Sequence, residues 1–286
     1  MDTSLREALE RSLDARITRA SRVHGGDVAI SYAADLDDGR RVFAKTHPGA
    51  PPEFFTTEAT GLTWLRAAGA LPVPEVLAVS DEPPNHLVLE WIDEGRPRAS
   101  TERDLGIGLA QLHLAGAPSF GREDRRTTGS RGLPNDPCAT WAEFYAKDRL
   151  LPLARLARRA GALPDASIAA LERLAPTLER FGAADEPPAR LHGDLWAGNR
   201  LVDAEGRSWL IDPAAHGGHR EFDLAMMRLF GGFGPDAYAA YDEVHPLASG
   251  WEDRVVLHQI APLVVHAIKF GGHYVGAAQA AIDRYV

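Results

Sequence analysis

The sequence predicts an α+β protein of two lobes, with a small β-rich lobe over residues 1–92 and a larger, mainly helical lobe over residues 93–286. Residues 28–32 alternate apolar with small side chains, and residues 41–45 contain an apolar run after a turn rich in Asp and Gly, which is typical of a β-hairpin. Beyond residue 100 the apolar residues mostly recur with the period of a helix. Together these patterns separate a β-rich beginning from a helical remainder.

In the small lobe, the spacing of Leu5, Leu9, Leu13 and Ile17 places four apolar side chains on one face of a helix. The other elements follow from apolar runs between turn signals such as Gly69 and the prolines near residue 83. The elements expected in this lobe are a helix over 2–20, strands over 28–32 and 41–45, a helix over 53–68, and strands over 76–79 and 86–91.

A linker is predicted over 93–99, where charged residues stand beside glycine and proline. In the large lobe, helices alternate with polar connections, and one short β-like island interrupts them at 190–212. The stretch 118–137 is rich in Gly, Pro and charge and is predicted to be a surface loop. Helices are expected over 101–115, 138–159, 165–181, 221–230, 235–243 and 251–269.

Composition excludes several classes of protein. The 31 basic and 40 acidic residues give a net charge of −9, which argues against a nucleic-acid partner, and no apolar run approaches the roughly 18 residues of a membrane span. The single cysteine, Cys138, excludes an intramolecular disulfide framework, and the residue is expected to be a buried apolar side chain. The charged start of the chain is unlike a signal peptide. We therefore expect a cytoplasmic protein that is a monomer or a weak dimer.

The strongest chemical signal is the stretch His192–Asn199, followed by Asp212 at the end of the β-like island. Asp194 stands five residues before Asn199, and Asp212 follows one hairpin later. This pattern matches phosphoryl transfer, in which a first Asp accepts the proton of the substrate hydroxyl and an Asn and a second Asp hold the metal ions on the nucleotide phosphates. Carboxylate and amide oxygens are ligands that suit Mg²⁺. The sequence thus predicts Asp194 as the catalytic base and Asn199 and Asp212 as metal ligands.

A lysine and two glycines occur where a nucleotide-binding lobe needs them. Lys45 ends a predicted apolar strand, and Glu58 lies on the helix that follows. In the protein-kinase plan such a lysine holds the α- and β-phosphates of ATP and pairs with a glutamate on the next helix. Gly25 and Gly26 precede the first strand of the hairpin, where backbone N–H groups can approach phosphates. The full G-x-G-x-x-G pattern is missing, so this part of the signal is weak.

The strand that ends the small lobe is the predicted binding site for the adenine base, in addition to the two predicted phosphate contacts. In a two-lobed kinase the adenine base hydrogen-bonds to backbone groups at this position. The corresponding residues are Glu90, Trp91 and Ile92, of which the Glu90 carbonyl and the Ile92 N–H are the expected contacts. A buried strand that leads into a linker would have the same sequence.

The catalytic loop differs from that of protein kinases in two places. Gly193 replaces the Arg of H-R-D, and Asp212-Pro-Ala replaces D-F-G. Both changes are typical of kinases that act on small molecules. The histidines do not form an H-E-x-x-H pattern and have no cysteine partner nearby in sequence, so a zinc site is not expected. His192 is expected to brace the loop through hydrogen bonds.

These motifs resemble the fructosamine kinase (ketosamine-3-kinase) family, within the wider group of aminoglycoside-phosphotransferase-like enzymes. The resemblance extends from Gly25 to Tyr274. The stretches that carry it are LHGDLWAGN at 191–199, IDPA at 211–214, GGHREFDLA at 217–225, LFGGF at 229–233 and FGGHY at 270–274. The HGD…N…D core is common to the wider group, whereas Asp-Leu-Trp, Gly-His-Arg-Glu and Phe-Gly-Gly are narrower signals.

The resemblance implies a protein-kinase-like fold and an enzyme that uses ATP and Mg²⁺ to phosphorylate the 3-hydroxyl of ketosamines, the sugar adducts of lysine and other amines. It implies that Trp196 lines the sugar site and suggests that His219 contacts substrate, although His219, Glu221 and Asp223 would alternatively fix the loop and the helix that follow Asp212. Some family members carry a cysteine in the glycine-rich loop. Here Asp27 follows the glycine pair, so no redox switch is expected there.

Three alternatives remain open at this point. A kinase of another small hydroxyl compound, such as an aminoglycoside, a choline-like amine or a sugar, would share the same core motif. A nucleotide-binding regulator without catalysis would be expected to have lost part of the Asp194, Asn199 and Asp212 set, which is intact here. A metal-dependent hydrolase would leave Lys45 and Glu58 without a role.

Overall fold

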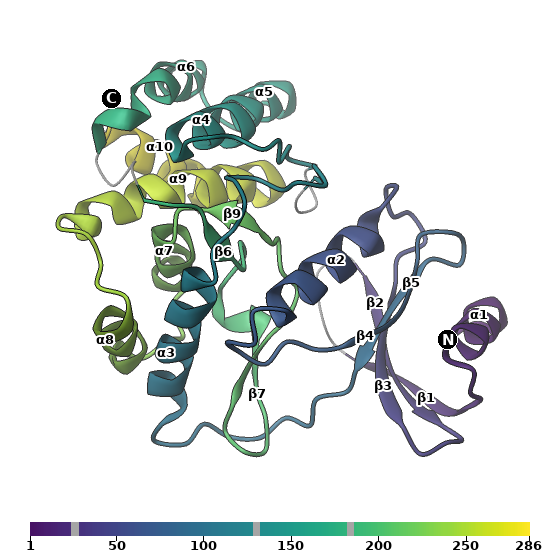
Figure 1. The fold of residues 1–286 in the computed structure, drawn as a ribbon. Helices are drawn as coiled ribbons and strands as arrows, with labels where there is room; N and C mark the ends of the chain where they lie inside the picture. Colours follow the sequence, from purple (N-terminus) through teal and green to yellow (C-terminus); the bar gives the residue numbers. More distant parts are fainter. Residues whose placement is uncertain (24–28, 128–131, 182–185) are drawn as a thin grey trace. The chain divides into compact units, whose positions relative to one another are not determined.

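The protein was analysed as a computed structural model, which describes residues 1–23, 29–127, 132–181 and 186–286. The chain forms two compact units (Figure 1). The first consists of Met1–Thr101 together with Arg200–Pro213, and the second of Glu102–Asn199 together with Ala214–Val286. The first unit therefore extends beyond residue 92 and includes a segment from the middle of the predicted large lobe.

The first unit is built on an antiparallel sheet in the order β1-β2-β3-β5-β4. A second, two-stranded sheet pairs β7 with β8. The elements of this unit are α1 (Thr3–Leu13), β1 (Ile17–Val23), β2 (Ile30–Leu36), β3 (Arg41–Thr46), α2 (Phe54–Arg66), β4 (Val76–Ser80), β5 (His86–Glu90), β7 (Arg200–Val202) and β8 (Ser208–Leu210).

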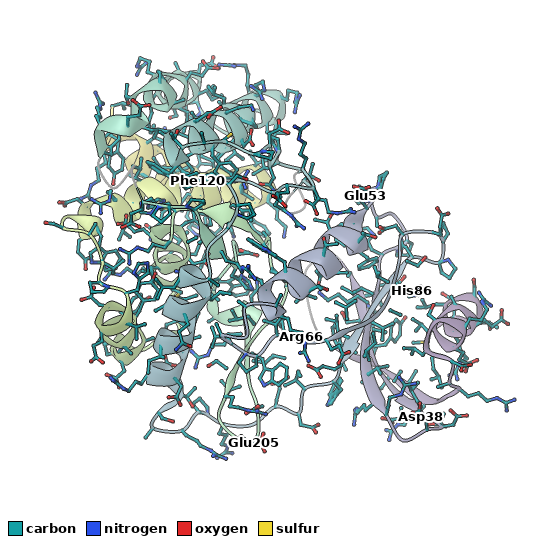
Figure 2. All side chains as sticks on the ribbon, in the orientation of Figure 1. Asp38, Glu53, Arg66, His86, Phe120 and Glu205 are labelled. Atoms are coloured by element: carbon teal, nitrogen blue, oxygen red, sulfur yellow. The ribbon has the colours of Figure 1, made fainter. Side chains whose placement is uncertain are left out.

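Helices α1 and α2 lie on opposite faces of this sheet (Figure 1). Leucines of α1 pack against Ala44 and Val88, and Ser12 and His86 join the helix to β5 through Oγ and Nε2 at 3.1 Å; Figure 2 labels His86 on the sheet. Because alternate strand residues face opposite sides, Lys45 and Leu87 face the side of α2. The strand alternation thereby directs Lys45 toward Glu58.

The predicted hairpin and the helix over 53–68 are confirmed, whereas the helix predicted over 2–20 is wrong in its second half. Helix α1 ends at Leu13 because Asp14 adopts a left-handed conformation, with φ of 50°. Strand β1 follows, and the Ile17 N–H donates to Glu10 Oε1 at 2.9 Å. The four-residue spacing of Leu5 to Ile17 therefore joins two different elements of one apolar cluster.

The second unit is mainly helical, and α9 runs through it with α7 on one side and α4, α5 and α10 on the other (Figure 1). Its elements are α3 (Thr101–Leu114, whose first residue belongs to the first unit), α4 (Trp141–Phe144), η1 (Tyr145–Leu150), α5 (Leu151–Ala160), α6 (Asp165–Leu174), η2 (Ala175–Phe181), β6 (Ala189–Leu191), η3 (Ala197–Asn199), β9 (His216–Gly218), α7 (Glu221–Phe230), α8 (Pro235–Val244), α9 (Trp251–Phe270) and α10 (His273–Asp283).

Most helices predicted for this unit are present, but four features of the unit differ from the prediction. The helix over 138–159 is divided by the π-helical turn η1, and the one over 165–181 ends as the 3₁₀ segment η2. Helix α10 and strand β9, which pairs with β6, were not predicted from the sequence. None of the helices in the described residues is both long and apolar enough to span a membrane.

Candidate active site

Lys45 lies in a buried ion-pair cluster with two carboxylates of the first unit. Its Nζ donates to Glu58 Oε1 at 2.8 Å and also pairs with Asp212 Oδ1. Burial alone would lower the pKa of Lys45, but the two carboxylates outweigh it and raise the pKa above its ordinary value. Burial raises the pKa of Glu58 to about 7 despite the nearby lysine, and the charge of Asp212 adds to this increase. The cluster thus holds a permanently charged ammonium between two acids.

Each member of this cluster is fixed by its own element. Lys45 is paired in register with Ser31 on β2 and with Leu87 on β5. Glu58 lies one turn into α2, whose first N–H groups are capped by Asp81 at 2.9 Å (from Phe55) and 3.3 Å (from Thr56). These backbone contacts leave Lys45 and Glu58 few alternative positions.

Asp212 reaches the cluster at the end of the β7–β8 hairpin. The Leu210 N–H donates to the carbonyl oxygen of Pro72 at 3.0 Å, and the Gly95 N–H donates to that of Val202 at 2.8 Å. Asp212 itself has a φ of 52°, a left-handed conformation that is uncommon for residues other than glycine. Such a conformation aims a side chain in a direction that regular strand geometry does not allow. The bonds to Pro72 and Gly95 hold the hairpin within the first unit.

The turn that contains Asp194 and Asn199 lies in the second unit. Nδ2 of Asn199 donates to the Asp194 backbone oxygen at 2.8 Å and to its carboxylate Oδ2 at 3.0 Å. Asn199 is buried, whereas Asp194 is half-buried. Because Nδ2 makes both bonds, Oδ1 is the atom that Asn199 can offer to a cation. The five-residue spacing thus brings the carboxylate and the amide into direct contact.

A buried carboxylate holds the start of this turn. Asp223 on α7 accepts the N–H groups of His192 at 2.8 Å and Gly193 at 2.9 Å. His113 on α3 lies 3.3 Å from the same carboxylate through Nε2, and its Nδ1 lies 2.8 Å from the hydroxyl of Tyr241. Burial alone would raise the pKa of Asp223, but the hydrogen bonds from His113 and Gly193 and the nearby histidines lower it below its ordinary value.

Gly193 stands where protein kinases have arginine, and the structure gives the reason. Its φ is 80°, and a Cβ atom there would lie 2.2 Å from the backbone oxygen of Ala214. His192 beside it is fully buried and accepts the Asp194 N–H at 3.3 Å through Nδ1. The prediction that His192 braces the loop through hydrogen bonds is confirmed.

Trp196 is the most exposed residue of this turn with a large side chain, with 41% of its surface accessible. Its ring folds back over Gly198, where a Cβ atom would lie 2.2 Å from Trp196 Cη2. The indole thus lies along the turn that carries Asp194.

His219 is 2% exposed and packs against the rings of Trp141 and His258, at centroid distances of 5.6 and 5.1 Å. Its suggested contact with substrate does not agree with this buried position. Glu221 is fully buried and accepts two hydrogen bonds from Arg254 at 2.9 and 2.6 Å. Burial would raise the pKa of Glu221, but His258, whose Nε2 lies 3.4 Å from Glu221 Oε2, and the hydrogen bonds from Arg254 lower it to about 2. Glu221 therefore joins α7 to α9, which agrees with the part of the alternative interpretation that concerns the helix after Asp212.

The remaining predicted residues are spread over the first unit. Glu90 ends β5, and Trp91 and Ile92 continue as extended chain. The Glu90 carboxylate accepts the Glu75 N–H at 3.1 Å, and the Trp91 indole donates to Asp93 at 2.9 Å. Gly25, Gly26 and Asp27 lie outside the described residues.

Sequence reasoning missed the bracing role of His113 and Tyr241. Both lie far from the motif in sequence, and no local pattern distinguishes them from other core residues. Cys138, by contrast, is buried as expected, and burial raises its pKa to about 11. A thiol with such a pKa is not a reactive nucleophile.

Comparison with known proteins agrees with the motifs. The chain is 36% identical over 256 residues to a "Probable ketoamine kinase" of Enterococcus faecium, which covers 88% of this chain and 90% of that one. It is 33% identical over 278 residues to the chloroplastic protein-ribulosamine 3-kinase of Arabidopsis thaliana, covering 95% of this chain and 83% of that one.

Solved structures agree as well. The structure of a candidate fructosamine-3-kinase from Thermobifida fusca is 37% identical, with a TM-score of 0.90, and covers 100% of this chain and 99% of that chain. An aminoglycoside phosphotransferase solved with streptomycin and ATP is 12% identical, with a TM-score of 0.69 over 100% of this chain and 99% of that one, and shares the fold alone. The predicted protein-kinase-like fold class is therefore confirmed.

The family model for fructosamine kinase matches residues 1–286, which is the whole chain. This match and the level of identity to the relatives confirm the resemblance drawn from the motifs. The chain belongs to the fructosamine kinase family.

Proposed function

We propose that this protein is an ATP-dependent kinase that phosphorylates the 3-hydroxyl of ketosamines such as fructosamine or ribulosamine adducts. The observation that carries the proposal is the buried cluster of Lys45, Glu58 and Asp212, because a fixed ammonium between two acids suits nucleotide phosphates and their metal ion. Membership of the fructosamine kinase family supports ketosamines as the substrate class.

Residues of the first unit would bind the nucleotide. Lys45 would neutralise phosphate oxygens while Glu58 keeps its ammonium in place. The Glu90 carbonyl and the Ile92 N–H would take the adenine, with Trp91 between them, and Gly25 and Gly26 would contribute backbone N–H groups to the phosphates. In this scheme the first unit binds and orients ATP, and it takes no part in the transfer of the substrate proton.

The donor set fits Mg²⁺. Asp212 offers a carboxylate and Asn199 an amide oxygen, and hard oxygen donors of this kind suit this ion. When bound, Mg²⁺ would neutralise charge on the transferring phosphoryl group. Two protein ligands would be enough for this role, since Mg²⁺ usually takes one or two from the protein, and phosphate oxygens and water complete the shell.

Asp194 would act on the sugar. Its carboxylate would accept the proton of the attacking 3-hydroxyl, while the bond from Asn199 Nδ2 to Oδ2 fixes its orientation. Trp196 would offer an aromatic face to the sugar ring beside it. Asp223 and His113 would then be positioning residues, because they hold the turn and do not meet the substrate.

The test measures ADP release with fructosyl-lysine, ribulosyl-lysine, free fructose and an aminoglycoside as acceptors. We expect turnover with the ketosamines, and a fall of about 10²–10⁴-fold in kcat for Asp194→Asn with nucleotide binding retained. Lys45→Ala should lose nucleotide use, whereas Lys147→Ala, which removes an exposed lysine, should not. Preference for the aminoglycoside over both ketosamines would overturn the substrate class, and full activity of Asp194→Asn would overturn the assigned base.

A further inference from the structure

An aromatic row begins at the Asp194 turn and runs across the second unit. We define it as Trp196, Phe230 at the end of α7, His266 and Phe270 on α9, and Tyr274 on α10. Each ring meets the next: the centroid distances are 6.2 Å from Trp196 to Phe230, 4.9 Å from Phe230 to His266, and 5.5 Å from His266 to Phe270. Tyr274 lies 4.9 Å from His266 and 6.0 Å from Phe270. The row therefore leads away from the proposed base in a continuous sequence of rings.

The aromatic row reaches the surface at Trp196 and at Phe270. Among the described residues, the two aromatic members of the small set of exposed large apolar side chains are Trp196, at 41%, and Phe270, at 53%. Phe230, His266 and Tyr274 between them are half-buried. Exposed aromatic surface costs free energy in water, and contiguous patches of it mark binding sites more often than scattered single residues do.

Two glycines allow the aromatic row to pack closely against the turn that contains Asp194. A Cβ atom on Gly198 would meet the Trp196 ring at 2.2 Å, and one on Gly232, just after α7, would lie 2.5 Å from Ala197 Cβ. The segment after α7 therefore touches the turn next to the proposed base, and Phe230 is held beside Trp196. This connection fixes the position of the row relative to Asp194.

We infer that the aromatic row binds the amine portion of the ketosamine, the part of the substrate that extends beyond the sugar. The inference rests on the proposed function, which puts the sugar at Asp194 and Trp196. The amine of a ketosamine is attached at the carbon two positions from the 3-hydroxyl, so it must leave the reacting centre at close range. A protonated secondary amine followed by a methylene chain suits aromatic faces, which attract cations and bury CH groups.

The row thereby favours ketosamines of long or peptide-bound amines, such as lysine, over those of small amines. A methylamine adduct ends at Trp196, whereas the four methylenes of a lysine side chain would extend to the neighbouring ring, Phe230, and the peptide groups of the lysine would continue toward His266 and Phe270. The sugar and the reacting hydroxyl are identical in the two adducts. We therefore expect substitutions in the aromatic row to alter the preference between amines and to leave the rate of the chemical step unchanged.

The experiment compares kcat/KM for two fructose adducts, one of methylamine and one of the ε-amino group of Nα-acetyl-lysine methylamide. For the wild type we expect a preference for the lysine adduct. An aromatic contact is worth about 0.5–1.5 kcal/mol, so Phe270→Ala should lower kcat/KM for the lysine adduct by about 2- to 12-fold and leave that for the methylamine adduct unchanged. Phe270→Tyr should retain the preference. Leu114→Ala, which removes an exposed apolar side chain from α3, is the matched control and should alter neither value.

The inference is overturned if Phe270→Ala, shown to be folded by circular dichroism, keeps the wild-type ratio of kcat/KM for the lysine adduct to that for the methylamine adduct. The proposed ketosamine kinase activity would still stand. An equal loss on both adducts would overturn it too, because it would place Phe270 in the folding or chemistry of the enzyme. If the wild type phosphorylates neither adduct, it is the proposed function that fails.

Discussion

The substitution Asp223→Asn tests how the Asp194 turn is held. The side chain keeps its size, but one of its two acceptor oxygens becomes an NH₂ group. In the wild type Oδ2 accepts the His192 N–H at 2.8 Å and Oδ1 accepts the Gly193 N–H at 2.9 Å. Whichever way the amide is turned, one of these backbone donors faces another donor. The carboxylate is fully buried, so water cannot replace the lost partner.

The size of the effect follows from these contacts. A hydrogen bond to a charged group contributes about 1.5–3 kcal/mol, and a buried donor left without an acceptor costs about 1–3 kcal/mol. Because some relaxation occurs, we expect the free energy of unfolding to fall by about 2–4 kcal/mol. Displacement of catalytic groups by about 1 Å can cost 10²-fold in rate, so kcat should fall by about 10- to 10²-fold. The KM for ATP should change less than kcat, since Lys45, Glu58 and Asp212 belong to the first unit and, of the proposed phosphate and metal ligands, Asn199 is the one that lies in the turn held by Asp223.

Urea unfolding and steady-state kinetics with both substrates measure these quantities. The control is Asp203→Asn, because Asp203 is also buried and also accepts two backbone N–H groups, from Glu205 at 3.0 Å and Arg207 at 2.8 Å, but in the β7–β8 turn. We expect it to lose stability without a comparable loss of kcat. The reasoning is refuted if Asp223→Asn, folded at the assay temperature, keeps the wild-type kcat, or if both variants lose kcat equally.

Three further predictions concern the second unit and the Lys45 cluster. Glu58→Gln removes a charged partner of Lys45 and should lower kcat/KM for ATP by about 10- to 100-fold, and an unchanged value would contradict its role. Gly232→Ala should lower both stability and kcat, because its Cβ would lie 2.5 Å from Ala197 Cβ, whereas Gly231→Ala, with φ also positive but open space around it, should lower stability alone. Burial, together with the charge of Arg149, lowers the pKa of His216 in the folded protein to about 3. The unfolded chain therefore takes up a proton at this residue before the folded protein does, so the free energy of unfolding is at its full value above pH 6.5 and falls as the pH falls toward 3. Urea unfolding of His216→Asn should therefore depend less on pH, by about 3 kcal/mol between pH 6.5 and 4.

Sequence patterns predicted those elements in which local and tertiary preferences agree. The β2–β3 hairpin has alternating residues and a turn of Asp and Gly, and α7 has a clear helical period. The pattern failed where one apolar cluster is built from two elements, as at Leu13 and Ile17, because the period of four continued across the end of α1. The left-handed conformation of Asp14 that ends the helix leaves no strong signal, since aspartate also occurs within helices.

The candidate site was predictable to the extent that motifs carry it. The kinase plan predicted the pair of Lys45 and Glu58, and the structure adds to it Asp212, which was expected beside Asn199 as a metal ligand. The support beneath the Asp194 turn was not predictable in the same way. His113 is separated from Asp223 by 110 positions, and its partnership depends on how α3 and α7 pack. Contacts of this kind arise from tertiary structure, which a single sequence does not display.

Asp212 and Asp194 are held in place by separate sets of hydrogen bonds, one within each unit. Asp212 is placed by bonds within the first unit, among them the one from Thr101 Oγ1 to the Gly206 carbonyl at 2.6 Å and the one from the Leu210 N–H to Pro72. Asp194 and Asn199 are placed within the second unit through Asp223. Substitutions such as Thr101→Val should therefore change mainly the kinetic constants for ATP, and substitutions around Asp223 mainly kcat. The two sets have no hydrogen-bond partner in common among these bonds, so a departure from additivity in a double mutant would report on the Mg²⁺ that Asp212 and Asn199 are proposed to share.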